Sequence, residues 1–119
     1  YFSNAYHSFI QLKNELNIHG KLLINPENLN LVLTPEGDEN VFSFGFSPGD
    51  NVYLEPYFYI QLEKVDEKIL HQLAKTIGIW NNKNWNGLVF LASEFLTLDP
   101  DHEKIRVMDF FKKNYWRLK

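Results

Sequence analysis

The segment Val41–Glu63, VFSFGFSPGDNVYLEPYFYIQLE, restricts the folds open to this chain more than any other. Its second half has the two-residue period of a β-strand. One side of this strand is apolar and the other carries tyrosines and an amide: Phe58, Ile60 and Leu62 against Tyr57, Tyr59 and Gln61. A strand with little polarity on either side must be covered on both, by helices of its own chain or by a partner. The segment therefore predicts a layered fold built around this strand.

The residues before this strand predict three more strands joined by turns. Strand character is found in residues 22–24, 29–34 and 41–46. The connections at 25–28 and 47–51 are built from turn-forming residues. Segment 21–63 therefore predicts a four-stranded antiparallel meander. Pro56, which cannot donate to a sheet ladder, indicates a bulge there or an edge position for residues 52–55.

An amphipathic helix is predicted before the meander. Ser3 or Asn4 caps this helix, which ends near Asn17 with Gly20 as its terminator. Its expected apolar stripe is Phe2, Tyr6, Phe9, Leu12 or Lys13, and Leu16.

Further helices are predicted after the meander. A helical stripe follows the cap residue Asp66 and ends at Gly78. The apolar run Leu88–Leu98 contains Val89 as its single β-branched aliphatic residue, so we favour helix over strand there. Asp99 and Pro100 start a last helix. Its expected buried residues are Ile105, Met108, Phe111 and Tyr115. The predicted fold is α+β: an N-terminal helix, a four-stranded antiparallel β-meander, then two to three C-terminal helices packed on the sheet.

Composition limits the classes of partner and compartment. The 119 residues fit one α+β domain, 1–119, and because the chain starts at Tyr1 and not Met we expect a processed protein or part of a longer chain. The net charge of −3 disfavours nucleic acid as a partner. The apolar run at 88–98 is too short to span a bilayer, residues 1–10 do not resemble a signal peptide, and the chain has no cysteine. We expect a cytoplasmic protein without membrane contact.

Catalytic and metal-binding patterns are weak. Glu67 and His71 are one helical turn apart but have no matching third ligand, so we expect a solvated pair and no metal site. The run Asp101-His102-Glu103 is better explained by acids gathering at a helix start. The six glycines form no phosphate-binding motif, and no serine lies in a nucleophile elbow. We therefore predict no catalytic residue and no cofactor.

Three features are the best candidates for binding. Tyrosines at alternate strand positions are typical of interfaces, and equally of a face covered by a helix. The Trp80–Gly87 loop, WNNKNWNG, combines indoles for stacking with amides for hydrogen bonding, although the indoles also suit closure of a core. Glu94 lies in apolar sequence and is expected to be partly desolvated. The candidate binding residues are Tyr53, Tyr57, Tyr59, Gln61, Trp80, Asn82, Trp85 and Glu94.

These features predict a non-catalytic interaction domain that contacts a protein partner, or a second copy of itself, through its aromatic sheet face and Trp/Asn-rich loop. The alternative is a small-molecule-binding protein or enzyme with a pocket between sheet and helices, using Glu94, His71 and the tyrosines. A third and weaker hypothesis is nucleic-acid binding by the basic C-terminal residues Lys112, Lys113, Arg117 and Lys119, which the dipole of a helix end also explains.

Overall fold

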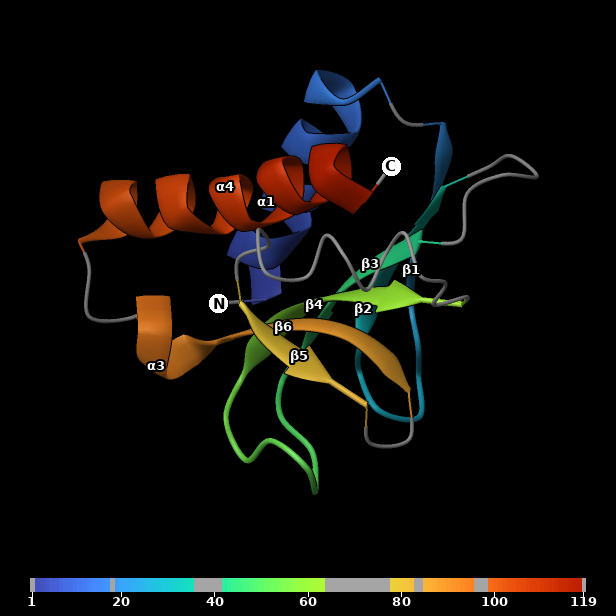
Figure 1. Ribbon diagram of the computed structural model, residues 1–119, viewed down its shortest axis with the longest axis vertical. Helices are drawn as coiled ribbons and strands as arrows, with labels where there is room; N and C mark the ends of the chain where they lie inside the picture. Colours follow the sequence, from blue (N-terminus) through green and yellow to red (C-terminus); the bar gives the residue numbers. More distant parts are fainter. Residues whose placement is uncertain are drawn as a thin grey trace.

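The computed structural model describes residues 2–17, 19–35, 42–63, 78–82, 85–95 and 99–118. The fold is α+β, with an antiparallel sheet and helices at the two ends of the chain (Figure 1). The helices are α1 (Phe2–Glu15), α3 (Ala92–Phe95) and α4 (Pro100–Leu118). The strands are β1 (Gly20–Ile24), β2 (Leu31–Pro35), β3 (Phe42–Ser47), β4 (Tyr57–Leu62), β5 (Ile79–Asn81) and β6 (Asn86–Leu91).

The sheet has six strands in the order β1-β2-β3-β4-β6-β5, and every pairing is antiparallel. The predicted meander forms its first four strands. The prediction of only four strands is wrong because β6 pairs with the second edge of β4 along that strand's whole length, from Tyr57 opposite Leu91 to Leu62 opposite Asn86. β4 is therefore a central strand. Pro56 lies directly before it and not inside it, and its carbonyl accepts a hydrogen bond from the Ala92 N–H at 2.8 Å.

The helix favoured for residues 88–98 is wrong for its first part. Leu88 and Phe90 lie in the main core, while Val89 lies on the other side of the sheet, which is the alternation of a strand buried on both sides. Because nearly every residue of this run is apolar, the sequence fits a helical stripe equally well. Among the residues of this run that the structure describes, only 92–95 are helical. Residues 79–81 and 86–87 of the predicted loop and its approach also lie in strands, so the segment is a hairpin.

The N-terminal helix buries a slightly different stripe from the predicted one. Ala5, Phe9 and Leu12 are fully buried, whereas Tyr6 is 43% exposed. Asn17 has a φ of 52°, the left-handed conformation that commonly ends helices. Asparagine tolerates this conformation better than most residues, so Asn17 terminates the helix and Gly20 instead begins β1.

The C-terminal helix begins as predicted. The Asp99 carboxylate accepts a hydrogen bond from the His102 N–H at 3.0 Å, and the Asp99 carbonyl accepts one from the Glu103 N–H. Met108, Phe111 and Tyr115 are buried as expected, but Ile105 is exposed. The predicted helix between Asp66 and Gly78 lies almost wholly outside the described residues.

Helices α1 and α4 lie together over one face of the sheet, and α3 follows the end of β6 (Figure 1). The core between the layers is rich in phenylalanine. The ring of Phe111 has centroid distances of 5.3 Å to Phe9 on α1, 5.6 Å to Phe44 on β3 and 5.7 Å to Phe58 on β4. Burial of these large rings fixes both helices on the sheet. The side chains of β4 that point the other way form a second, smaller cluster.

Candidate contact surface on the tyrosine face of the sheet

The second cluster is built on Tyr57, Tyr59 and Val89, and we call their side of the sheet the tyrosine face. Tyr57 and Tyr59 are only 2% and 6% exposed. In the described part of the chain no helix residue belongs to this cluster. Among the described residues, the hydrophobic side chains that cover it are Tyr53, Trp85 and Leu91, which are half-buried. We call these three side chains the aromatic surface, because they form the outer layer of the tyrosine face.

Two glycines allow the rings to lie close to the sheet. Gly45 on β3 is directly opposite Tyr59 on β4, and a Cβ on Gly45 would lie 2.0 Å from Cζ of that ring. A Cβ on Gly87 of β6 would lie 2.6 Å from Cζ3 of Trp85 and even closer, at 2.1 Å, to the carbonyl oxygen of Ile60 on β4. Any side chain at either position would occupy the space of an aromatic ring. The cross-strand pairing of glycine with an aromatic residue also shields the backbone that glycine leaves open.

The loop between β3 and β4 folds over this face around Asp50. One carboxylate oxygen of Asp50 accepts hydrogen bonds from the N–H groups of Val52 (2.9 Å) and Tyr53 (2.8 Å). The other accepts one from the Tyr57 hydroxyl at 2.5 Å. Desolvation raises the pKa of Asp50, but the hydrogen bonds from Tyr53, Tyr57 and Val52 outweigh it, so this pKa lies below its ordinary value. Asp50 therefore acts as an ionised anchor for the loop.

Burial is also the first cause of the raised pKa values of the three tyrosines. The pKa of Tyr57 is raised furthest, by burial and then by its hydrogen bond to the Asp50 carboxylate. Burial raises the pKa of Tyr59, and burial together with the Asp50 charge raises that of Tyr53. All three phenols are thus neutral hydrogen-bonding groups at physiological pH, and not bases or nucleophiles.

Asn81 joins this loop to the β5–β6 hairpin. Its side-chain oxygen accepts a hydrogen bond from the Tyr53 hydroxyl at 2.9 Å, and its side-chain nitrogen donates to the Trp85 carbonyl at 2.8 Å. Asn81 is itself buried. The ring of Trp85 lies 5.3 Å from that of Tyr59, and the ring of Tyr53 lies 5.2 Å from that of Tyr57 (centroid distances). The half-buried rings of Tyr53 and Trp85 are therefore held in place by buried ones.

The structure brings together some of the candidate residues and separates others. Tyr53, Tyr57, Tyr59 and Trp85 are in contact, and the half-buried Gln61 lies beside them, opposite Gly87. Trp80 does not join them, because it is opposite Leu88 and packs against the main core on the helix side. The two tryptophans of the predicted loop thus lie on opposite faces of the sheet. Asn82 is exposed after β5.

Glu94 lies on α3, away from the tyrosine cluster, and is exposed. Desolvation raises the pKa of Glu94; the Arg106 cation opposes the rise and the Glu55 carboxylate adds to it. Glu55 accepts a hydrogen bond from the Ser93 N–H. This hydrogen bond connects Glu55, at the end of the β3–β4 loop, to the start of α3, so Glu55 has a structural role.

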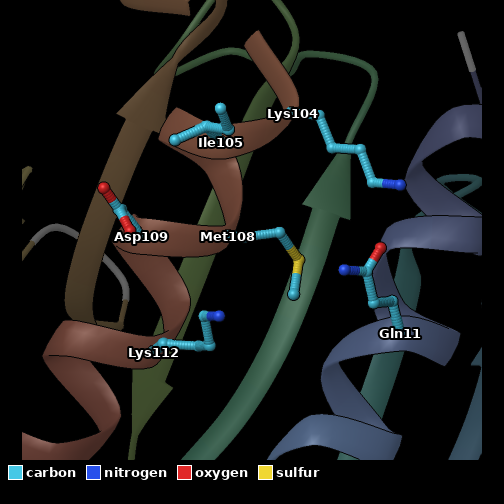
Figure 2. A pocket seen from close by; sticks show the side chains of 6 residues that line it. All are labelled: Gln11, Lys104, Ile105, Met108, Asp109 and Lys112. Atoms are coloured by element: carbon cyan, nitrogen blue, oxygen red, sulfur yellow. The ribbon is translucent and has the colours of Figure 1, made fainter. Parts of the chain in front are cut away.

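A groove of about 270 Å³ lies between α1 and α4 (Figure 2). Lys104, Met108 and Lys112 lie along one side of α4, and Gln11 faces them from α1. The Lys112 ammonium is 3.2 Å from a Glu15 carboxylate oxygen, which lowers the pKa of Glu15. The spacing of four residues between Lys104, Met108 and Lys112 can be read from the sequence, but the sequence does not show which residues of α1 face them. Sequence analysis therefore missed this groove.

The remaining candidates that lie within the described residues form no metal-binding cluster. At the start of α4, Nδ1 of His102 lies 2.7 Å from a carboxylate oxygen of Asp99. Farther along the helix, the Lys113 ammonium lies 3.6 Å from a carboxylate oxygen of Asp109. Glu67 and His71 lie outside the described residues. Within the ranges described here, no three His, Asp or Glu side chains gather closely enough to hold a metal ion.

Sequence analysis also missed the residues that hold the aromatic surface in place: Gly45, Gly87, Asp50 and Asn81. Asp50 was interpreted only as a turn residue, and Asn81 only as one of the amides of the Trp80–Gly87 loop. A glycine inside an aromatic strand is a signal of close approach by another group, although it does not name that group.

None of the described helices is long and apolar enough to cross a membrane. Compared with protein-family models, with curated proteins and with solved structures, the chain matches none.

Proposed function

We propose that this chain is a non-catalytic binding domain that contacts a protein partner through the aromatic surface of Tyr53, Trp85 and Leu91. The observation that carries this proposal is the combination of partial exposure with fixed position. Tyr53 is held by its hydrogen bond to Asn81, and Trp85 by its ring contact with Tyr59 and its packing over Gly87.

Such an arrangement suits binding for an energetic reason. Ordering a side chain at an interface costs about 0.5–1.5 kcal/mol, and side chains that are already ordered avoid much of this cost. Tyrosine and tryptophan are also the residues that most often dominate interface energies, particularly when polar side chains surround them. Here Gln61, opposite Gly87, supplies a polar group beside the aromatic surface. A partner with complementary apolar residues is the expected ligand.

Site-specific photo-cross-linking tests this proposal. A photoreactive amino acid replaces Gln61 at the margin of the aromatic surface, and Trp116, exposed on α4, in the control. We expect position 61 to capture a protein that position 116 does not. The captured partner, once purified, should bind the Trp85→Ala variant at least tenfold more weakly than it binds the unchanged chain. It should bind the Trp116→Ala variant with unchanged affinity.

Thermal unfolding of both alanine variants checks that each is folded at the assay temperature. Because Trp85 also covers the buried cluster, Gln61→Lys provides a second test that leaves all three surface residues in place. It should weaken binding by placing a charge at the margin. Equal binding by Trp85→Ala, Gln61→Lys and Trp116→Ala would contradict the proposal.

The alternative of a small-molecule site or an enzyme between sheet and helices has less support. Tyr57 and Tyr59 lie on the other side of the sheet from α1 and α4, and Glu94 is exposed on α3, so these groups do not converge on one cavity. The feature that favours a small ligand is the groove between α1 and α4. Its volume of about 270 Å³ is just below the usual range for ligand pockets, about 300–1,000 Å³. We therefore place this function second.

A further inference from the structure

We propose that the groove between α1 and α4 binds a small organic anion, namely a free carboxylate with a short aliphatic body. The groove lies on the side of the sheet that carries the main core, and the tyrosine face is on the other side. This inference therefore concerns a different surface from the one that carries the proposed function, and the two proposals can be tested separately.

The groove offers apolar contacts to a ligand. Met108 is only 5% exposed and belongs to the main core, and Figure 2 shows its thioether reaching from α4 toward Gln11 on α1. Ile105 also lines the groove and is 57% exposed. A thioether adapts readily to the shape of an apolar group placed against it, and covering Ile105 would remove apolar surface from water. The groove therefore suits a ligand with a hydrocarbon part.

The charged side chains of the groove, taken with their ion pairs, leave one net positive charge. Lys112 is balanced by Glu15 at 3.2 Å. Asp109 is balanced by Lys113 at 3.6 Å, and its side chain points away from α1 (Figure 2). Among the described residues Lys104 forms no ion pair, and its side chain extends toward α1. A ligand with a single negative charge is therefore the electrostatic complement of this groove.

A carboxylate of this protein already shows the chemistry that the groove favours. The Gln11 amide donates a hydrogen bond to Glu15 at 3.1 Å, and the Lys112 ammonium contacts the other oxygen of the same carboxylate. The Lys112 hydrogen bond is the main cause of the lowered pKa of Glu15, and the Lys104 charge adds to it. An amide nitrogen carries two N–H donors and an ammonium carries three. Gln11 and Lys104 can therefore bind a second carboxylate, through charge-assisted hydrogen bonds.

The size of the groove limits both the ligand and its affinity. A volume of about 270 Å³ is small for a drug-sized molecule, so a ligand with few atoms fits best. Such a ligand makes few contacts, and we expect a dissociation constant on the order of 1 mM. Because α1 and α4 come from the two ends of the chain, a ligand that contacts both helices also stabilises their packing.

NMR of the methionine methyl group tests the proposal. Met108 is the only methionine of the sequence, so isotope labelling of this methyl group, in protein released from a cleavable fusion, gives one signal from the groove. Titration with hexanoate to about 20 mM near neutral pH should shift this signal and approach saturation.

Two further ligands separate the contributions of charge and hydrocarbon. Acetate has the same charge and lacks four methylene groups, each of which strengthens binding by about fourfold when fully buried, so it should bind at least tenfold more weakly. Hexylammonium has the same aliphatic body and the opposite charge, and it should also bind at least tenfold more weakly. A hexylammonium response equal to that of hexanoate would overturn the proposal, and so would equally tight binding of acetate or of inorganic phosphate. Tighter binding of N-acetyl-leucine, which resembles a peptide C-terminus, would assign the groove to a chain end and also overturn it.

Two lysine variants separate the local charge from the overall charge. Lys104→Glu reverses the unpaired cation of the groove and should raise the dissociation constant for hexanoate at least fivefold. Lys21→Glu makes the same change on β1, outside the groove, and should leave this constant unchanged. Thermal unfolding checks that both variants are folded. No shift of the Met108 signal with hexanoate, or equal weakening by the two variants, would overturn the proposal. None of these results depends on Trp85, so the proposed function is tested separately.

Discussion

The replacement Gly45→Ala tests the close packing on which the tyrosine face depends. A Cβ at this position would lie 2.0 Å from Cζ and 2.4 Å from the hydroxyl oxygen of Tyr59. Carbon atoms pack best at about 3.5–4.0 Å, so the ring would have to move by roughly 1.5–2 Å. Tyr59 is almost fully buried and is in contact with Trp85, so its ring has little space to move within the face. It must swing outward and expose both rings.

The expected cost follows from two opposing effects. Overpacking a filled interior costs about 1–3 kcal/mol. Alanine regains about 0.5–1 kcal/mol over glycine in a strand, because the unfolded chain has less freedom to lose. The net expectation is a loss of about 1–2 kcal/mol in the free energy of unfolding, which lowers the Tm by roughly 3–10 °C in a domain of this size.

Urea unfolding followed by circular dichroism measures this change. A double-mutant cycle with Tyr59→Leu isolates the contact, because a smaller side chain leaves room for the new methyl group. We expect the double variant to be more stable than the sum of the single effects predicts, by about 1 kcal/mol. Ser43→Ala, on the same strand and face, is the control and should change stability by less than about 0.5 kcal/mol. A Gly45→Ala variant as stable as the original chain, or a strictly additive cycle, would refute the packing argument.

Two further predictions concern the loops. Leu29 has a φ of 59° and is 58% exposed. Leu29→Asn should therefore stabilise the protein by about 0.5–1 kcal/mol in urea unfolding, because asparagine tolerates the left-handed conformation. A loss of stability would show that this conformation is not adopted. Asp50→Asn should cost about 1–2 kcal/mol near neutral pH, the order of a hydrogen bond to a charged group. Because the pKa of Asp50 is lowered in the folded state, its stabilising effect is fully present above the ordinary pKa of the carboxyl group and is lost as the pH falls through the lowered value. Unfolding measured from pH 2 to 7 should therefore show the difference between the two proteins shrinking at low pH, and a constant difference would contradict the role given to Asp50.

The covering of the tyrosine face limits the proposed contact surface to its outer residues. Tyr57 and Tyr59 cannot bind a partner directly, since their rings are buried beneath Tyr53 and Trp85. Their contribution is to hold the outer rings in place. Substitution of a buried tyrosine would therefore reduce stability and binding together. Substitution at the outer margin, as in Gln61→Lys, should affect binding more than stability.

The sequence by itself determined several of the local elements and some of their boundaries. The two-residue alternation of apolar side chains predicted the first four strands and the two-sided burial of β4. The Asp99-Pro100 pair predicted the start of α4. These features depend on neighbouring residues only: side chains alternate along any strand, and a cap needs one side chain and the free N–H groups that follow it.

Only the tertiary structure decided how these elements meet. The run beginning at Leu88 suits a helix or a strand by its apolar content, and its pairing with the open edge of β4 makes it a strand as far as Leu91. Trp80 and Trp85 are close in sequence, yet the sheet register places them on opposite faces. Gly45 meets Tyr59, and Asp50 meets Tyr57, only because β3 and β4 pair in one particular register. Register depends on contacts between distant segments, and periodicity within one segment does not specify it.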